Sequence, residues 1–202
     1  MLYPESLQNL INCYKKLPGV GEKSAERMAL CSLEFDFDTS SNFAQALLDV
    51  KQKIKRCSIC NNLSEDDLCP VCKNTSRNNK LICVVEEPKN IIQFEKSGFF
   101  NGVYHVLDGL ISPLDDINPE DLNIENLIKR VNDENIEEVI LALKPSIEGE
   151  ATSLYITKLL ENSNVKITKI AHGVPIGADI DYIDALTLEM AFEERKMIEY
   201  LW

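Results

Sequence analysis

The sequence predicts a multidomain α+β protein, and three observations lead to this prediction. Two helix-like runs flank a glycine-containing turn near residue 20, four cysteines then follow as two closely spaced pairs, and strand-like and helix-like segments alternate to about residue 170. Such alternation indicates a parallel sheet with right-handed crossovers. Together with shifts in composition, these features divide the chain into four expected parts: 1–56, 57–80, 81–172 and 173–202.

The first part is expected to contain two helices joined by a tight turn. Apolar residues recur at helical spacing over residues 5–16, and a second amphipathic helix is expected over about residues 22–32. Pro18 interrupts the first helix, and Gly19 and Gly21 can adopt positive φ without the penalty of a Cβ atom. Glycines at the start of a helix also let a second backbone approach closely.

This turn carries the chemistry expected of a phosphate contact. The free N–H groups at the start of the second helix carry partial positive charge, which suits a phosphate oxygen. Lys23 and Arg27 lie four residues apart on one face of that helix, so both can reach the same run of phosphates. Contacts of this kind position DNA without reading its sequence. The alternative is an ordinary turn with a solvated basic face, but segment 17–29 (LPGVGEKSAERMA) resembles the helix-hairpin-helix motif of DNA repair proteins.

Four cysteines in the second part predict a structural zinc site. Cys57 and Cys60 form one CxxC pair, and Cys69 and Cys72 form another. Four thiolates at this spacing fill a tetrahedral Zn²⁺ shell and leave no coordination position for water. Since the surrounding segment is too small and polar to bury a core, metal ligation is expected to supply its folding energy. We therefore expect chelation to melt residues 57–80 without abolishing the rest of the fold.

Disulfides or a redox CxxC are the alternatives for these four residues. A disulfide scaffold fits poorly, because the chain has seven cysteines, an odd count, and begins with no recognisable secretory signal. The remaining three cysteines lie in apolar runs and are expected to be core residues rather than reactive thiols: Cys13, Cys31 and Cys83.

The charge of the chain is distributed unevenly. The 202 residues carry a net charge of -12, but residues 1–80 hold 11 Lys/Arg and 10 Asp/Glu, whereas residues 81–202 hold 10 and 23. Such acidity argues against coating DNA by bulk attraction and favours one defined contact surface, or docking of a basic partner. A basic run over 51–56 is either a further phosphate contact or a solvated helix face. No apolar run approaches the roughly 20 residues of a membrane span, so we expect a cytoplasmic, nucleoid-associated protein without membrane contact.

The third part alternates strand-like and helix-like segments. Strands are expected at 81–86, 103–107, 138–143 and 165–170, with helices at about 88–97, 123–134 and 149–161. Ligands of parallel sheets usually bind at the carboxyl ends of strands. Glu86 ends the first strand, and an acidic loop that contains Glu148 and Glu150 follows the third.

These two loops resemble the Toprim fold of topoisomerases and primases. In catalytic Toprim domains, a Glu on the first loop and an Asp-x-Asp on the second hold Mg²⁺ for phosphoryl transfer. Glu86 matches the first acid, and Glu148 and Glu150 match later ones, but Lys144 and Ser146 occupy the two aspartate positions. An ammonium group opposes metal binding, so Mg²⁺ is doubtful here. Weak Mg²⁺ binding at Glu86 and Glu148, or a merely solvated loop, remain as alternatives.

The order of hairpin, four-cysteine finger and Toprim-like domain resembles the RecR family of bacterial recombination mediators over essentially the whole chain. The strings that support the resemblance are the hairpin segment and both CxxC pairs, with CVVEEPK at 83–89, YHVLDGLISPLDDINPEDL at 104–122, EGEAT at 148–152 and IAHGVPIGADIDYID at 170–184. The resemblance implies a non-catalytic role in recombinational repair, in which the protein acts with RecO and RecF and helps to load RecA at single-stranded gaps.

The resemblance also implies an oligomer and a DNA site. RecR proteins form ring-like tetramers, and here a dimer or a tetramer is expected. DNA, whether single-stranded, double-stranded or gapped, is expected to contact the hairpin at Gly19, Gly21, Lys23 and Arg27. Two hypotheses from other classes stay open: a Mg²⁺-dependent nuclease or primase, and a pure protein adaptor whose acidic half docks basic partners.

Some positions depart from the usual RecR pattern. Asn90 replaces a common Asp, which further weakens any metal site. Ala178 replaces a second Gly, which makes ATP binding by the glycine-rich C-terminal loop doubtful, and loop 172–177 lacks the P-loop pattern. We expect it to be a turn in which His172 makes a structural hydrogen bond.

Helical spacing over 182–202 predicts a core-packing or partner-binding helix, and subunit contacts that involve Tyr200 and Trp202 are implied by the family.

Overall fold

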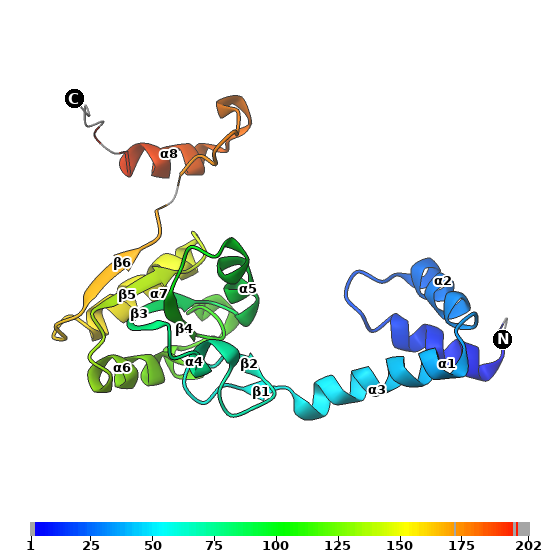
Figure 1. Ribbon diagram of the computed structural model, residues 1–202. Helices are drawn as coiled ribbons and strands as arrows, with labels where there is room; N and C mark the ends of the chain where they lie inside the picture. Colours follow the sequence, from blue (N-terminus) through cyan, green and yellow to red (C-terminus); the bar gives the residue numbers. More distant parts are fainter. Residues whose placement is uncertain (1–2, 172, 196, 198–202) are drawn as a thin grey trace. The chain divides into compact units, whose positions relative to one another are not determined.

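The structure is a computed structural model that describes residues 3–171, 173–195 and 197 (Figure 1). The chain forms two compact units, residues 1–54 and 55–202. The predictions made for His172, Tyr200 and Trp202 lie outside the described residues. None of the helices in the described part is long and apolar enough to cross a lipid bilayer.

Two antiparallel helices and a tight turn form the core of the first unit. The helices are α1 (Glu5–Tyr14) and α2 (Glu22–Ser32), and their buried residues are Leu7, Ile11, Ala25 and Ala29. Because α2 contributes alanines, the two helices can approach closely. The second predicted helix is confirmed at its predicted bounds, whereas α1 ends two residues before the predicted 16.

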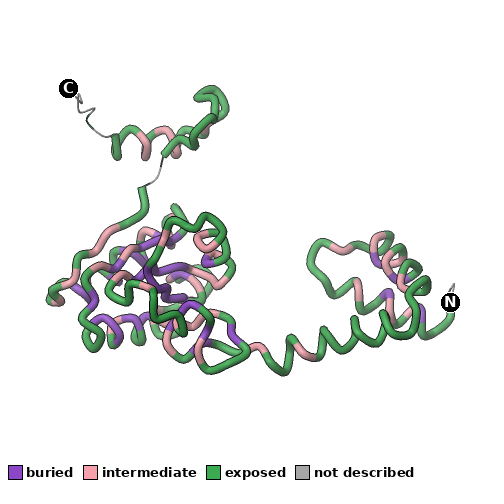
Figure 2. The backbone as a smooth tube through the Cα atoms, viewed as in Figure 1, coloured by how far each residue is buried: buried purple, intermediate pink, exposed green. Residues whose placement is uncertain are grey.

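The third helix of this unit, α3 (Phe37–Lys53), buries none of its residues. The Asp36 side chain caps its first turn by accepting a hydrogen bond from the Thr39 N–H at 2.7 Å. Phe43, Leu47 and Val50 recur at helical spacing, and their exposed fractions are 48%, 62% and 64%. In Figure 2, α3 is almost entirely in the exposed colour. An apolar stripe of this kind normally faces a core or a partner.

A four-stranded parallel sheet organises the second unit. Its order is β4-β3-β5-β6, with β3 (Asn78–Val85), β4 (Gly102–Val106), β5 (Glu138–Ala142) and β6 (Lys166–Lys169). The helices between the strands are α5 (Pro88–Ser97), α6 (Ile124–Asp133) and α7 (Ile147–Leu159), together with the 3-10 turns η1 (Pro113–Asp115) and η2 (Pro119–Asp121). The predicted alternation of strands and helices is confirmed, with bounds that differ by at most three residues.

Alternate residues of β3 enter two different cores. Ile82 and Val84 join a cluster that includes apolar side chains of α6 and α7. Cys83 and Val85 join a second cluster with Tyr104 and with side chains of α5. Successive side chains of a strand point to opposite faces, so the central strand is covered on both sides. Buried residues accordingly concentrate at the sheet in Figure 2.

The cysteine-containing segment is a small finger that packs on this sheet. It consists of β1 (Lys55–Arg56), β2 (Leu63–Ser64) and α4 (Pro70–Lys73), and β1 and β2 pair antiparallel. The Val106 N–H of β4 donates to the Cys60 carbonyl at 2.9 Å. Cys57, Cys60 and Cys69 belong to the same buried cluster as Val85 and Tyr104. The finger therefore shares a core with the sheet, and the expectation that this segment buries no core needs correction.

The C-terminal segment contains the turn η3 (Ile180–Tyr182) and the helix α8 (Ala185–Glu193). The helix is shorter than the predicted run over 182–202, in part because Asp184 caps it. The Asp184 carboxylate accepts a hydrogen bond from the Thr187 N–H at 2.9 Å, which sets the first turn after residue 184.

Candidate functional site

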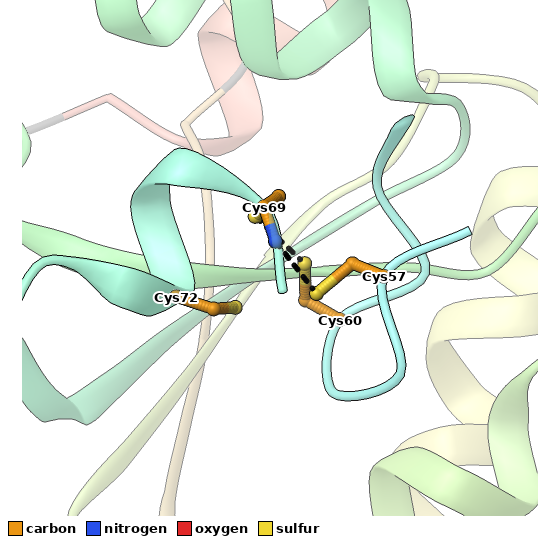
Figure 3. Close-up of side chains that lie close together, drawn as sticks. All are labelled: Cys57, Cys60, Cys69 and Cys72. Carbon is orange, nitrogen blue, oxygen red and sulfur yellow. Dashed lines mark hydrogen bonds between the residues drawn. The ribbon is translucent and has the colours of Figure 1, made fainter. Parts of the chain in front are cut away.

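Four sulfur atoms converge at the junction of the finger and the sheet. The Sγ atoms of Cys57, Cys60, Cys69 and Cys72 all lie within 4.8 Å of one another, and those of Cys60 and Cys69 are 3.5 Å apart. Figure 3 shows the four side chains pointing toward a common centre. A tetrahedral zinc with Zn–S bonds of about 2.3 Å requires sulfur separations of about 3.8 Å. The four cysteines therefore fit one structural Zn²⁺ ion, with no position open for water.

Local backbone geometry brings the two pairs together. The Asn61 N–H donates to the Cys57 carbonyl at 3.0 Å, and Asn61 adopts a left-handed φ of 61°, which closes the first turn. Cys69 is the N-cap of α4 and Cys72 lies one turn later, so both sulfurs face the same side. The Cys69 N–H also donates to the Cys57 sulfur at 3.3 Å, a contact that stabilises a thiolate.

The thiols perturb one another strongly at this distance. Hydrogen bonds from the thiols of Cys60 and Cys72 lower the pKa of Cys69. The hydrogen bond to Cys69, with burial, raises the pKa of Cys60 to about 12. The thiol of Cys69 therefore ionises more readily, whereas ionisation of Cys60 becomes harder. A bound dication is needed to hold all four sulfurs as thiolates.

The other three cysteines do not share one environment. Cys83 is buried in β3 as predicted, and burial raises the pKa of its thiol to about 12. Cys13 and Cys31 are exposed, so the prediction that they are core residues is wrong. Each lies two positions after a buried residue of its helix, Ile11 or Ala29, and two positions on an α-helix correspond to nearly the opposite face.

The two hairpin glycines differ in conformation. Gly19 has a φ of +79°, in the region that favours glycine. Gly21 has a φ of -82° and is the extended N-cap residue of α2. Its backbone therefore does not use the positive φ that glycine allows. A Cβ atom built on Gly21 meets no heavy atom within 4 Å. Open space at the first turn of α2 leaves room for a second molecule to approach the backbone.

Lys23 and Arg27 are both exposed on α2. Within the residues that the structure describes, neither of them forms an ion pair. The nearest acidic residue of the first turn, Glu22, instead pairs with Lys15 of the loop after α1. Of the second basic run, Lys53 pairs with Asp49 at 2.7 Å. Among the described residues, the hairpin therefore presents two exposed cations that are not engaged in an ion pair.

The acidic residues of the third part do not gather at one point. Glu86, after β3, and Lys144, after β5, line a hollow of about 530 Å³ that does not include Glu148 or Glu150. The Glu150 carboxylate lies 3.1 Å from Lys169 on β6. A hydrogen bond from Ser146 lowers the pKa of Glu148, with a smaller contribution from the charge of Lys144. Sequence reasoning missed Lys169, because only the folded sheet brings it beside Glu150.

Comparison with known families adds four matches in chain order. Residues 7–51 match the RecR helix-hairpin-helix, 54–74 the RecR four-cysteine zinc finger domain, 80–171 the Toprim domain and 173–196 the RecR C-terminal region. The chain belongs to the RecR family. RecR domains place the protein in recombinational DNA repair, and the family is generally non-catalytic despite its Toprim domain. The RecR zinc finger match also agrees with the convergence of the four cysteines.

Proposed function

We propose that this RecR-family protein is a non-catalytic, DNA-binding mediator that acts with RecO and RecF to help load RecA at single-stranded gaps. The observation that carries the proposal is the pair of exposed cations on α2, Lys23 and Arg27, beside the Gly19 turn. DNA in single-stranded, double-stranded or gapped form is the proposed ligand, with Gly19 and Gly21 providing the close backbone approach.

Charge at the hairpin supports this proposal. The first turn of α2 presents free N–H groups and partial positive charge, and Lys23 lies in that turn. The carboxylate of Glu22 is neutralised by Lys15, so it does not repel a phosphate. One hairpin offers few phosphate contacts, and binding through several copies on one DNA raises the overall affinity.

A charge-reversal experiment tests the hairpin. The double variant Lys23→Glu/Arg27→Glu is expected to lose at least about tenfold in affinity for a gapped oligonucleotide at low salt. Each lost phosphate contact should also reduce the slope of log K against log salt by about 0.7–0.9. The matched control is Lys129→Glu/Lys158→Glu in the Toprim domain, which changes the net charge equally. Equal losses in both double variants, or none in either, would contradict DNA contact at the hairpin.

We also propose a homo-oligomer, either a dimer or a tetrameric ring. The uncovered stripe of Phe43, Leu47 and Val50 on α3 supports it, because an exposed apolar face of this kind is usually covered in an assembly. Light scattering should give a mass above one chain for the wild type and a smaller mass for Leu47→Glu. Gln52→Glu, an equal charge change on an exposed residue of α3, should leave the mass unchanged.

The remaining expectations are kept as proposals. We propose no catalytic residue, since Lys144 and Ser146 stand at the aspartate positions of the Toprim pattern. Plasmid nicking with Mg²⁺ that disappears in Glu86→Ala would favour the nuclease alternative. Partner binding that survives the hairpin double variant while DNA is not bound would favour a pure adaptor.

Reduced zinc-binding thiols support a cytoplasmic location. The proposed domains are residues 1–56, 57–80, 81–172 and 173–202.

A further inference from the structure

The Toprim domain of this chain does not fit a divalent cation. In the described part of the chain, the residues that converge closely enough to hold a metal ion are the four zinc cysteines, and Glu86, Glu148 and Glu150 form no such group. Glu86 lines the hollow at the carboxyl ends of β3 and β5, and Lys144 lines the same hollow. An ammonium group beside that hollow repels a dication.

Lysines offset the carboxylates around this edge of the sheet. Lys89 lies 2.6 Å from Glu87, and Lys169 lies 3.1 Å from Glu150. Lys144 acts on Glu148 through its charge, which contributes to the lowered pKa of that carboxyl. Among the described residues, Glu86 forms no ion pair and is partly buried. Lys89, Lys144 and Lys169 therefore partly offset the acidic charge at this edge, to which Asp115 also contributes beside Glu148.

The backbone that carries Lys144 is held in place by α7. A Cβ atom on Gly149 would lie 1.9 Å from the Lys144 carbonyl oxygen, so α7 packs directly on that peptide. The same carbonyl accepts a hydrogen bond from the Ser146 N–H at 2.9 Å. Because its main chain is held in this way, Lys144 stays beside the hollow that it lines.

We propose that Lys144 supplies, as part of the chain, the positive charge that a divalent cation supplies in catalytic Toprim domains. The Toprim edge is then a metal-independent surface, where the charge of Lys144 opposes entry of a dication into the hollow that Glu86 lines. Replacement of Lys144 by a carboxylate removes the repulsion and adds an oxygen ligand beside Glu86, which creates a site for Mn²⁺ or Mg²⁺. This inference does not rest on the DNA-binding proposal, since its readout is metal binding.

The experiment titrates Mn²⁺ into zinc-loaded protein and follows free Mn²⁺ by electron paramagnetic resonance. Lys144→Asp is expected to bind one Mn²⁺ per chain at least about tenfold more tightly than the wild type. Lys158→Asp is the matched control, because it makes the same charge change at an exposed position in the last turn of α7. Adding Glu86→Gln to Lys144→Asp should remove the gain, and the zinc content should stay at one ion per chain throughout.

Three results would overturn the proposal. They are a wild-type affinity for Mn²⁺ equal to that of Lys144→Asp, an equal gain in Lys158→Asp, and a gain that survives Glu86→Gln. If Lys144→Asp alters the far-ultraviolet circular dichroism spectrum, Lys144→Asn takes its place, with a smaller gain expected from loss of the repulsion alone. Absence of any gain in the folded variant would show that the lysine does not exclude the metal.

Discussion

Arg56 of the finger donates a hydrogen bond to the Asp108 carboxylate at 2.6 Å, across 52 positions of sequence. Arg56 lies on β1, and Asp108 follows β4 with a left-handed φ of 72°. The same guanidinium donates to the carbonyl of Asn61, the residue directly after Cys60, at 3.1 Å. Arg56, one of the cations considered for a phosphate contact, thus joins the finger to the Toprim domain.

Substitution Arg56→Ala is expected to lower the free energy of unfolding by about 0.5–1 kcal/mol. The value is small because Arg56 and Asp108 are both 41% exposed, and water screens such pairs. Urea unfolding measures the change, and Lys55→Ala, on the neighbouring residue of β1, is the control. An effect of Arg56→Ala no larger than that of Lys55→Ala would argue against a structural role for the pair.

Zinc removal is expected to weaken more than the finger. Cys57, Cys60 and Cys69 share a buried cluster with Val85 and Tyr104, so loss of the metal should loosen that face of the sheet as well. We expect chelation to increase amide hydrogen exchange in β3 and β4 as well as in residues 57–74. Exchange that rises only within the finger would restore the expectation, drawn from the sequence, that this segment melts by itself.

Glu95 is expected to be important for the stability of the Toprim domain. Its carboxylate accepts hydrogen bonds from Arg77 Nη1 at 2.9 Å and from the Tyr104 hydroxyl at 2.7 Å, and the Arg77 bond lowers the pKa of Glu95. Glu95→Ala removes the acceptor of the Tyr104 hydroxyl and the carboxylate partner of Arg77, whose Nη1 still donates to the Gly102 carbonyl, and should cost about 1–3 kcal/mol in unfolding free energy. Glu137→Ala, which breaks an exposed pair with Lys80, is the control and should cost less than about 1 kcal/mol.

Acid is expected to destabilise the fold through His105. This side chain is fully buried on β4, its Nδ1 finds no hydrogen-bond partner among the described residues, and burial lowers its pKa from 6.5 to about 4. The unfolded chain therefore binds a proton before the folded one does, and stability should fall as the pH drops from about 6.5 to about 4. The full loss is on the order of 3 kcal/mol.

Urea unfolding at a series of pH values measures this loss. His105→Gln, which cannot titrate, is expected to show a flatter dependence between pH 6.5 and 4, whatever its absolute stability. If the variant and the wild type have the same slope in this range, another group is responsible for the acid sensitivity.

Local patterns in the sequence predicted most of the secondary structure. Helix α2 and the strands of the sheet have clear apolar patterns and boundary residues. Each of them forms close to the residues that its local sequence predicts. The two CxxC pairs likewise predicted the convergence of the cysteines. The apolar residues next to Cys13 and Cys31 in sequence wrongly suggested that both cysteines are buried. Burial in a helix depends on the face on which a residue lies and not on the residues adjacent to it in sequence.

Long-range pairs were beyond the sequence analysis. Arg56 and Asp108, or Glu150 and Lys169, meet only after the sheet has formed, and nothing near either residue in the chain identifies its partner. Local sequence also did not decide the conformation of Gly21, since a glycine can serve as an extended N-cap as readily as it adopts positive φ. Tertiary context decides such cases.

The backbone bond from Val106 to Cys60 has a consequence for self-association. β4 is an outer strand of the sheet, and the first zinc knuckle occupies part of its hydrogen-bonding rim through this bond and through the Asn61 side chain, which donates to the Val106 carbonyl at 3.3 Å. Uncovered outer strands recruit strands of other molecules and start aggregates. By holding the knuckle in place, the zinc ion is expected to keep this edge from pairing with strands of other molecules and so to oppose aggregation.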